Sequence, residues 1–215
     1  MHTYKPKVVF ISETRQRNEV VNKLRWRLGL KHCITQAGKG KGAGIVLFYD
    51  ENVEIKKLAV GPRYIDVLIR LNPHGLLWRG TFVYEEPKAH ERHHMWNLLR
   101  RLKDNSNLPW MMVGDFNEVM WQSEHFSVSR RSEKQMEYFR NVLSECKLYD
   151  LGFRGPKWTY DNKQEGQKNV RARLDRAVAA SCWSNEFKEA TIEHICTTRS
   201  DHLPVLLCVG PRKEW

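Results

Sequence analysis

The sequence predicts one α/β domain over residues 1–215, with two packed β-sheets and helices on their outer faces. Strand and helix patterns alternate along the chain, but four predicted strands follow one another between residues 45 and 84 with no helix between them. That succession suits a two-sheet sandwich better than a doubly wound parallel sheet. A length of 215 residues is that of one domain. With 41% apolar residues and eight Trp, the composition excludes global disorder.

The amino-terminal part contains one predicted helix among six predicted strands. In the helix, 15–28, four apolar residues share one face, and Gly29 follows as a stop signal. The strands are short apolar or β-branched runs separated by proline, glycine and asparagine. They cover residues 7–11, 31–35, 45–49, 54–60, 64–71 and 77–84.

The carboxyl-terminal part reads as two helices and five strands. The helices are predicted at 89–102 and 134–146, and Trp26, Trp96 and Trp183 fall in helical patterns that place them in the core. The strands are predicted at 110–113, 157–160, 173–178, 191–195 and 205–209.

The charge of the chain is strongly positive and unevenly distributed. Thirty-six Lys and Arg against 25 Asp and Glu give a net charge of +11. Residues 1–50 hold ten basic and three acidic residues, and 154–176 hold seven and three. Such an excess favours a polyanionic partner, nucleic acid above all, over a generically basic surface without a partner. The mixture of Trp158 and Tyr160 with basic neighbours suits a nucleic-acid groove, although alternation predicts that at least one of the two rings is core.

Other features limit the class of protein. No stretch approaches the ~18 apolar residues of a membrane span, and the amino end lacks the apolar segment of a signal peptide. Five cysteines without a C-x-x-C pair indicate free, mostly buried thiols. We therefore expect a soluble, intracellular protein. The glycine–lysine loop 38–44 is read as a flexible hairpin or a phosphate contact, and His90, His93 and His94 as a solvated helix face rather than a metal pair.

Several carboxylate, amide and imidazole side chains follow predicted strands or directly precede one. Loops at strand ends are where folds display catalytic groups. Carboxylate and amide oxygens suit Mg²⁺, and a histidine beside aspartates suits acid–base chemistry. Glu13 has a second interpretation, as a capping residue of the following helix. The candidates are Glu13, Asp115, Asn117, Asp175, Asp201 and His202.

Five motifs in this order resemble the endonuclease/exonuclease/phosphatase superfamily, closest to the apurinic-type endonuclease domain of plant non-LTR (LINE-type) retrotransposons. The resemblance extends from about Lys5 to Val209. The motifs are Ser12-Glu-Thr14, Tyr84 with Pro87, Gly114-Asp-Phe-Asn117, Arg173-Leu-Asp-Arg176 and Ser200-Asp-His202.

The resemblance implies a four-layered α/β sandwich, helix–sheet–sheet–helix, and a Mg²⁺-dependent phosphodiester hydrolase, with Mn²⁺ as an alternative cation. Glu13 and Asp201 resemble the metal-binding residues. Asp115 resembles the residue that orients or deprotonates the attacking water, and Asn117 its hydrogen-bonding neighbour.

The same resemblance assigns the phosphate-binding residues. Tyr84 and His202 resemble the tyrosine and histidine that contact the phosphate, and Asp175 the aspartate that orients the histidine. An Asp175 carboxylate that accepts a hydrogen bond from His202 would favour the cationic imidazole.

The chain departs from the family pattern at two points. It contains no Asn-x-Arg-Gly motif, so we expect an amino-terminally truncated domain that lacks its first strand. Glu85 follows Tyr84 where the subgroup has glycine, which places a negative charge beside a phosphate-binding position.

The function that we predict is a Mg²⁺-dependent DNA endonuclease of retrotransposon origin, impaired by truncation. Two alternatives stay open, a phosphatase acting on small or lipid phosphates and an inactive nucleic-acid-binding remnant. The expected partner is DNA and not a membrane, and the expected location is the nucleus rather than the cytoplasm. A reverse transcriptase domain is expected in the parent element and is absent here, and the oligomeric state is left open.

Overall fold

The computed structural model describes residues 4–37, 44–85 and 91–210, which divide at residue 84 into two compact units. The prediction of a single domain stays a prediction. Most of the loop 38–44, and both Pro87 and His90, lie outside the described residues.

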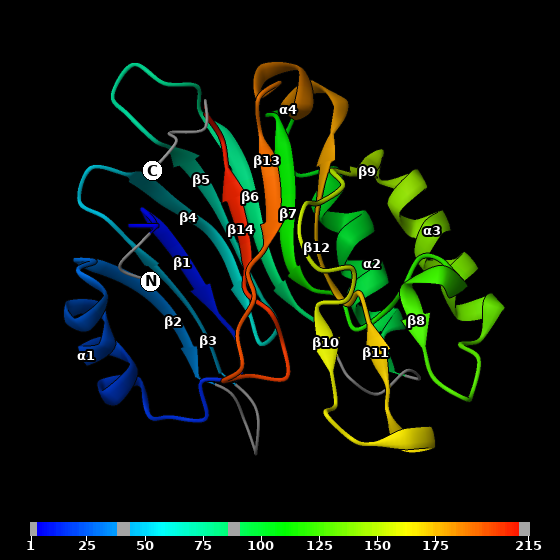
Figure 1. Ribbon diagram of the computed structural model, residues 1–215. Coiled ribbons are helices and arrows are strands. Elements are labelled where there is room, and N and C mark those ends of the chain that lie inside the picture. Colours follow the sequence, from blue (N-terminus) through cyan, green and yellow to red (C-terminus); the bar gives the residue numbers. More distant parts are fainter. Residues whose placement is uncertain (1–3, 38–43, 86–90, 211–215) are drawn as a thin grey trace. The chain divides into compact units, whose positions relative to one another are not determined.

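The described residues of unit 1 form one helix and two antiparallel sheets (Figure 1). One sheet has the strand order β1-β3-β2, and the other contains β4, β5 and β6 in sequence. These strands match the six predicted ones closely. The elements are β1 (Val8–Ile11), α1 (Asn18–Leu28), β2 (His32–Ala37), β3 (Gly44–Tyr49), β4 (Glu54–Gly61), β5 (Tyr64–Arg70) and β6 (Trp78–Tyr84).

The core of unit 1 lies on both faces of β3. Val46 and Phe48 pack with Val21 of α1, so the helix covers one face of the sheet. Ile45 and Leu47 alternate to the opposite face, where β3 lies against β5. Burial on both faces explains why this strand is an unbroken apolar run.

Two expectations for α1 are wrong. The helix begins at Asn18 rather than near residue 15, and Arg17 before it is extended, so Glu13 does not cap it. Trp26 is 63% exposed instead of buried. The face of α1 that packs on the sheet carries Val21, Leu24 and Leu28, and Trp26 falls outside that stripe, where the Arg25 guanidinium lies over its ring.

Unit 2 contains the other helices and three groups of strands. β12 pairs antiparallel with β7 and β9, β13 pairs with β14, and β11 lies between β10 and β8. The helices are α2 (His93–Lys103), α3 (Glu133–Glu145) and α4 (Ser181–Glu186). The strands are β7 (Trp110–Asp115), β8 (His125–Phe126), β9 (Leu148–Asp150), β10 (Tyr160–Asp161), β11 (Arg171–Ala172), β12 (Asp175–Ala180), β13 (Thr191–His194) and β14 (Val205–Cys208), with 3₁₀ turns at Gln122–Glu124 and Gly166–Lys168.

The core of unit 2 confirms two of the three tryptophan predictions. Trp96 of α2 stacks on Phe139 of α3 with ring centroids 4.9 Å apart, and Trp183 is fully buried. His93 and His94 are exposed on α2, as expected for a solvated helix face. The cysteines are free, but Cys182 and Cys196 are exposed, so the expectation of mostly buried thiols is wrong.

The predicted strand 173–178 begins two residues later in the structure, as β12 at Asp175. The Arg173 amide donates to the Glu124 carbonyl and the Leu174 amide to the Thr159 hydroxyl, in the two residues that separate β11 from β12. The predicted strand 157–160 likewise shrinks to β10, which begins only at Tyr160.

Candidate active site

The first part of the site is the loop that follows β7. Gly114 has φ +145°, which favours glycine, and Asn117 has φ +50°, which asparagine tolerates better than most residues. The Asn117 amide donates to Asp115 Oδ1 at 2.8 Å, and its side-chain Nδ2 donates to Asp115 Oδ2 at 2.9 Å. Nδ2 also reaches the Glu85 carbonyl at 3.0 Å. Phe116 is fully buried and anchors the loop. The Gly-Asp-Phe-Asn motif thus fixes one carboxylate at a strand end.

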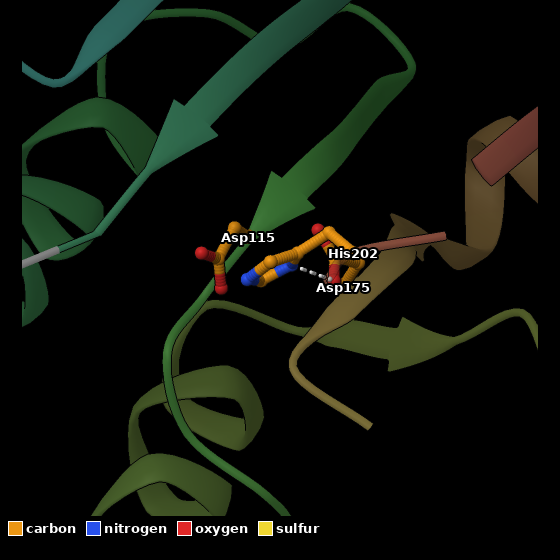
Figure 2. A group of neighbouring side chains, drawn as sticks. All are labelled: Asp115, Asp175 and His202. Carbon is orange, nitrogen blue, oxygen red and sulfur yellow. Dashed lines mark hydrogen bonds and ion pairs between the residues drawn. The ribbon is translucent and has the colours of Figure 1, made fainter. Parts of the chain in front are cut away.

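The second part is a histidine–aspartate pair that faces Asp115. Asp175 lies directly opposite Asp115 in the β7–β12 register. His202 Nδ1 donates to Asp175 Oδ2 at 2.9 Å, which confirms the expected hydrogen bond. Figure 2 shows the His202 ring between the two carboxylates. Ligand-type atoms of all three residues lie within 4.8 Å of one another.

The electrostatics of the pair favour a cationic imidazole. Burial lowers the pKa of His202, but the Asp175 hydrogen bond and the charges of Asp175, Asp115 and Asp201 outweigh it and raise this pKa to about 9. The side chain remains 31% exposed. At neutral pH the site therefore presents one positive imidazolium beside two carboxylates.

Asp201 and Tyr160 border this pair. The Asp201 carbonyl accepts the Asp161 amide at 2.9 Å, and Asp201 itself is exposed. The Tyr160 ring packs on the His202 ring with centroids 5.0 Å apart. Tyr160 and Trp158 are both half-buried, and Thr159 between them is the fully buried residue. Neither ring is fully buried, but Tyr160 packs against a core cluster that contains Val119 and Met136, so the expectation of one core ring is met in part.

The Asn117 loop has a basic support that the sequence did not identify. Arg131 donates to the Asn117 carbonyl at 2.8 Å and pairs with the buried Glu118 at 2.8 Å. Arg92 pairs with the other oxygen of Glu118 at 2.6 Å.

Two predicted site residues, Glu13 and Tyr84, belong to unit 1. The Tyr84 hydroxyl donates to Glu13 Oε1, and Arg15 pairs with Glu13 Oε2 at 2.5 Å. Tyr84 is buried, whereas the Glu13 side chain is 38% exposed. The structure thus joins Glu13 to Tyr84 and, separately, Asp115 to Asn117, Asp175 and His202. That Glu13 and Asp201 share one Mg²⁺ stays a prediction.

A hard cation such as Mg²⁺ requires oxygen ligands, above all carboxylates. Glu13 and Asp201 offer partly exposed carboxylate oxygens, the ligands that Mg²⁺ accepts. The group Asp115–Asp175–His202 fits a cation less well, because a protonated imidazole whose Nδ1 already donates to Asp175 has no lone pair there to offer. The division between metal-binding and phosphate-binding residues stays a prediction.

Comparison with known protein families identifies the family of the chain. A family model described as the endonuclease/exonuclease/phosphatase family matches residues 1–202. No curated protein matches the chain significantly in sequence.

Similar solved structures include two apurinic endonucleases and a retrotransposon domain. An AP endonuclease from Archaeoglobus fulgidus superposes with a TM-score of 0.70 at 17% identity, covering 97% of this chain and 90% of the other. The AP endonuclease LMAP of Leishmania major gives 0.71 at 15%, covering 98% and 80%. The endonuclease domain of TRAS1, a telomere-specific non-LTR retrotransposon, gives 0.62 at 15%, covering 97% and 100%. These likenesses confirm the predicted α/β sandwich fold class.

Proposed function

The chain belongs to the endonuclease/exonuclease/phosphatase family, and we propose that it hydrolyses phosphodiester bonds of DNA with a divalent cation. The observation that carries the proposal is the Asp175–His202 hydrogen bond with Asp115 beside it. Hydrolysis of a phosphodiester requires positive charge at the nonbridging oxygens and a base for the attacking water. A cationic imidazole and a neighbouring carboxylate are suited to these two tasks.

Each residue of the site has a distinct part in this proposal. His202, held cationic by Asp175, donates from Nε2 to a nonbridging phosphate oxygen. Asp115 accepts the proton of the attacking water, and Asn117 orients the Asp115 carboxylate through its two hydrogen bonds. Glu13 and Asp201 would hold the Mg²⁺ or Mn²⁺ ion, which supplies further stabilisation of negative charge in the transition state.

The choice of DNA rests on charge and on a cluster of aromatic and cationic side chains. The net charge of +11 favours a polyanion. At the sheet formed by β10, β11 and β8, the Arg171 guanidinium lies 5.8 Å from the Phe126 ring centroid and 5.5 Å from that of Trp158. Lys157 Nζ lies 5.5 Å from the Trp158 ring. Aromatic faces beside cations suit stacked bases and phosphates better than a small free phosphate.

Nicking of supercoiled plasmid is the direct test. The protein should nick with Mg²⁺ and stop with EDTA. Asp175→Asn and His202→Gln should both reduce the rate strongly, whereas His94→Gln, a change at an exposed helix position, should not. Nicking that persists in EDTA would remove the cation from the proposal.

The two alternatives are separated by a parallel assay. Release of phosphate from an inositol phosphate, without nicking, would indicate a phosphatase acting on small or lipid phosphates. DNA binding without either reaction would indicate an inactive remnant.

The metal-binding assignment needs a readout besides activity. The melting temperature should rise with added Mg²⁺, and Glu13→Gln or Asp201→Asn should each weaken this rise. Glu165→Gln, an exposed loop change, is the matched control. An unchanged rise in both variants would contradict the assignment.

The origin and location of the protein are part of the same proposal. We place its origin in a LINE-type retrotransposon, supported by the ordered motifs and by the likeness to the TRAS1 domain. A nuclear location follows from a DNA substrate and is tested by microscopy of a tagged chain.

None of the helices in the described part of the chain is both long and apolar enough to cross a membrane.

A further inference from the structure

Thr159 is a buried residue outside the proposed catalytic and metal-binding groups. It lies just before β10 and is 0% exposed. Its hydroxyl oxygen accepts two backbone N–H groups, from Leu174 at 3.0 Å and from Asp175 at 2.9 Å. Its own amide donates to the Ala172 carbonyl at 3.0 Å, and its carbonyl accepts the Leu203 amide at 2.7 Å. The side chain, amide and carbonyl of Thr159 thus bind two separate stretches of chain, 172–175 and Leu203.

Each of these two stretches lies at one member of the histidine–aspartate pair. The hydroxyl binds the amide of Asp175 itself, and the carbonyl binds the residue directly after His202. The amides of Leu174 and Asp175 fall at the break between β11 and β12. A buried amide without an acceptor is costly, so this break needs an acceptor at that point. The Thr159 hydroxyl supplies it and thereby places the start of β12.

The segment that carries Thr159 is itself anchored on both sides. Upstream, the Arg154 amide donates to the Ile192 carbonyl at 2.8 Å, and the buried His194 ring binds the Pro156 carbonyl at 2.7 Å. Downstream, the Asp161 amide donates to the Asp201 carbonyl at 2.9 Å. A residue fixed on both sides is able to hold its neighbours in place rather than follow them.

We propose that Thr159 is a positioning residue that sets the Asp175–His202 hydrogen bond through its hydroxyl oxygen. Valine has nearly the same shape but cannot accept a hydrogen bond, whereas serine keeps the oxygen. In Thr159→Val the two amides lose their acceptor, the start of β12 shifts, and the carboxylate moves relative to the imidazole. The proposal rests on the proposed function for its kinetic readout alone.

The first test is proton NMR of the full chain, which needs no activity. The Nδ1–H of a histidine bound to a carboxylate gives a separate downfield resonance, and Asp175→Asn identifies it by its loss. Thr159→Ser should retain this resonance, and Thr159→Val should lose or shift it. Thr81→Val is the matched control, because Thr81 is equally buried and its hydroxyl donates to Asp66 at 2.7 Å. The control should lose stability and keep the resonance.

The second test is the rate of nicking. A misplaced catalytic group costs up to about 100-fold, so turnover of Thr159→Val should fall about 10- to 100-fold with little change in KM. Thr159→Ser should restore turnover.

The outcomes decide the proposal in either direction. A folded Thr159→Val protein with an unchanged resonance overturns it. If that variant does not fold, a folded Thr159→Ser protein without the resonance overturns it, and one with the resonance supports it. If the parent protein does not nick any substrate, the proposed function fails, and the NMR result still decides the role of Thr159.

Discussion

Replacing Arg176 with methionine should lower the free energy of unfolding by about 3–5 kcal/mol. Arg176 is 0% exposed and binds Glu124 and Asp150 at 2.8 Å each. Arg173 binds the same two carboxylates at 3.0 and 2.8 Å, so the four charges cancel. Methionine fills similar space without charge and leaves one negative charge unpaired in the interior. A buried charge that loses its partner is among the costliest single changes.

This loss is large compared with the whole stability of a domain, which is about 5–15 kcal/mol. For a chain of this size, 1 kcal/mol corresponds to about 2–4 °C, so the melting temperature should fall by about 6–20 °C. Urea denaturation of the full chain, followed by tryptophan fluorescence and by circular dichroism, measures the change. Arg100→Met is the matched control, because its pair with Glu145 lies at the surface, where solvent screens the charges, and should contribute little.

A double variant tests the electrostatic reason for the loss. Asp150→Asn in the Arg176→Met background removes the unpaired charge and keeps an oxygen for the Gly152 amide, which now donates to Asp150 Oδ1 at 2.7 Å. The double variant should therefore be more stable than Arg176→Met alone. Equal losses in Arg176→Met and Arg100→Met, or a double variant less stable than the single one, would refute the reasoning.

The same network predicts a pH dependence. Burial raises the pKa values of Glu124 and Asp150, but the Arg176 and Arg173 guanidinium groups outweigh burial and hold both pKa values below their usual range. A carboxyl whose folded pKa is depressed adds stability above its ordinary pKa, and that stability is lost as pH falls. The parent protein should thus lose stability as pH falls below about 4. In Arg176→Met this acid loss should be smaller, because the two carboxyls lose a cation that depresses their folded pKa values.

Three further predictions concern the site and its substrate. The pKa of His202 is raised from an ordinary 6.5 to about 9. The charged His202 therefore stabilises the folded protein fully below pH 6.5, and this contribution is lost as pH rises through 9. Urea denaturation should show this decline in the unsubstituted protein and not in His202→Gln. Phe126→Ala should weaken single-stranded DNA binding, measured by fluorescence anisotropy, by about 1–3 kcal/mol. Tyr149→Ala, a change at an exposed ring on β9, should leave the binding unchanged. Equal losses in the two variants would contradict a stacking role for Phe126. Binding to duplex DNA should fall with salt at a log–log slope of about −0.9 per phosphate neutralised, and a flat dependence would exclude phosphate contacts.

Long apolar strands were predictable because a strand that is buried on both faces is apolar at consecutive positions. β3 is buried along almost its whole length, and its sequence Gly44–Tyr49 is correspondingly apolar. The short strands β8 and β11 were not predictable. They contain two residues each and exist because β11 pairs on both sides, with β10 and with β8. Such pairing depends on residues far apart in the sequence, and no local period reports it.

The candidate site likewise contains residues that the sequence predicts and residues that it does not. The pair Asp175–His202 could be expected from two motifs, and its hydrogen bond is present. Thr159 could not be expected, because its importance lies in backbone partners at Leu174, Asp175 and Leu203 that only the folded chain brings near. A threonine in a sequence carries no sign of which amides it will bind. The exposure of Trp26 has a similar cause, since one helical position decides whether a ring faces the sheet or the solvent.

The motif Arg173-Leu-Asp-Arg176 combines two tasks on adjacent residues. Because side chains alternate along a strand, Asp175 and Arg176 point to opposite faces of β12. Asp175 meets His202, whereas Arg176 lies among Glu124, Asp150 and the Phe139 ring, 5.6 Å from its centroid. Arg176 thus stabilises β12 on one face, whereas Asp175 binds His202 on the other. Nicking lost through Arg176→Met should therefore follow the folded fraction and return at low temperature, whereas nicking lost through Asp175→Asn should stay lost in a fully folded protein.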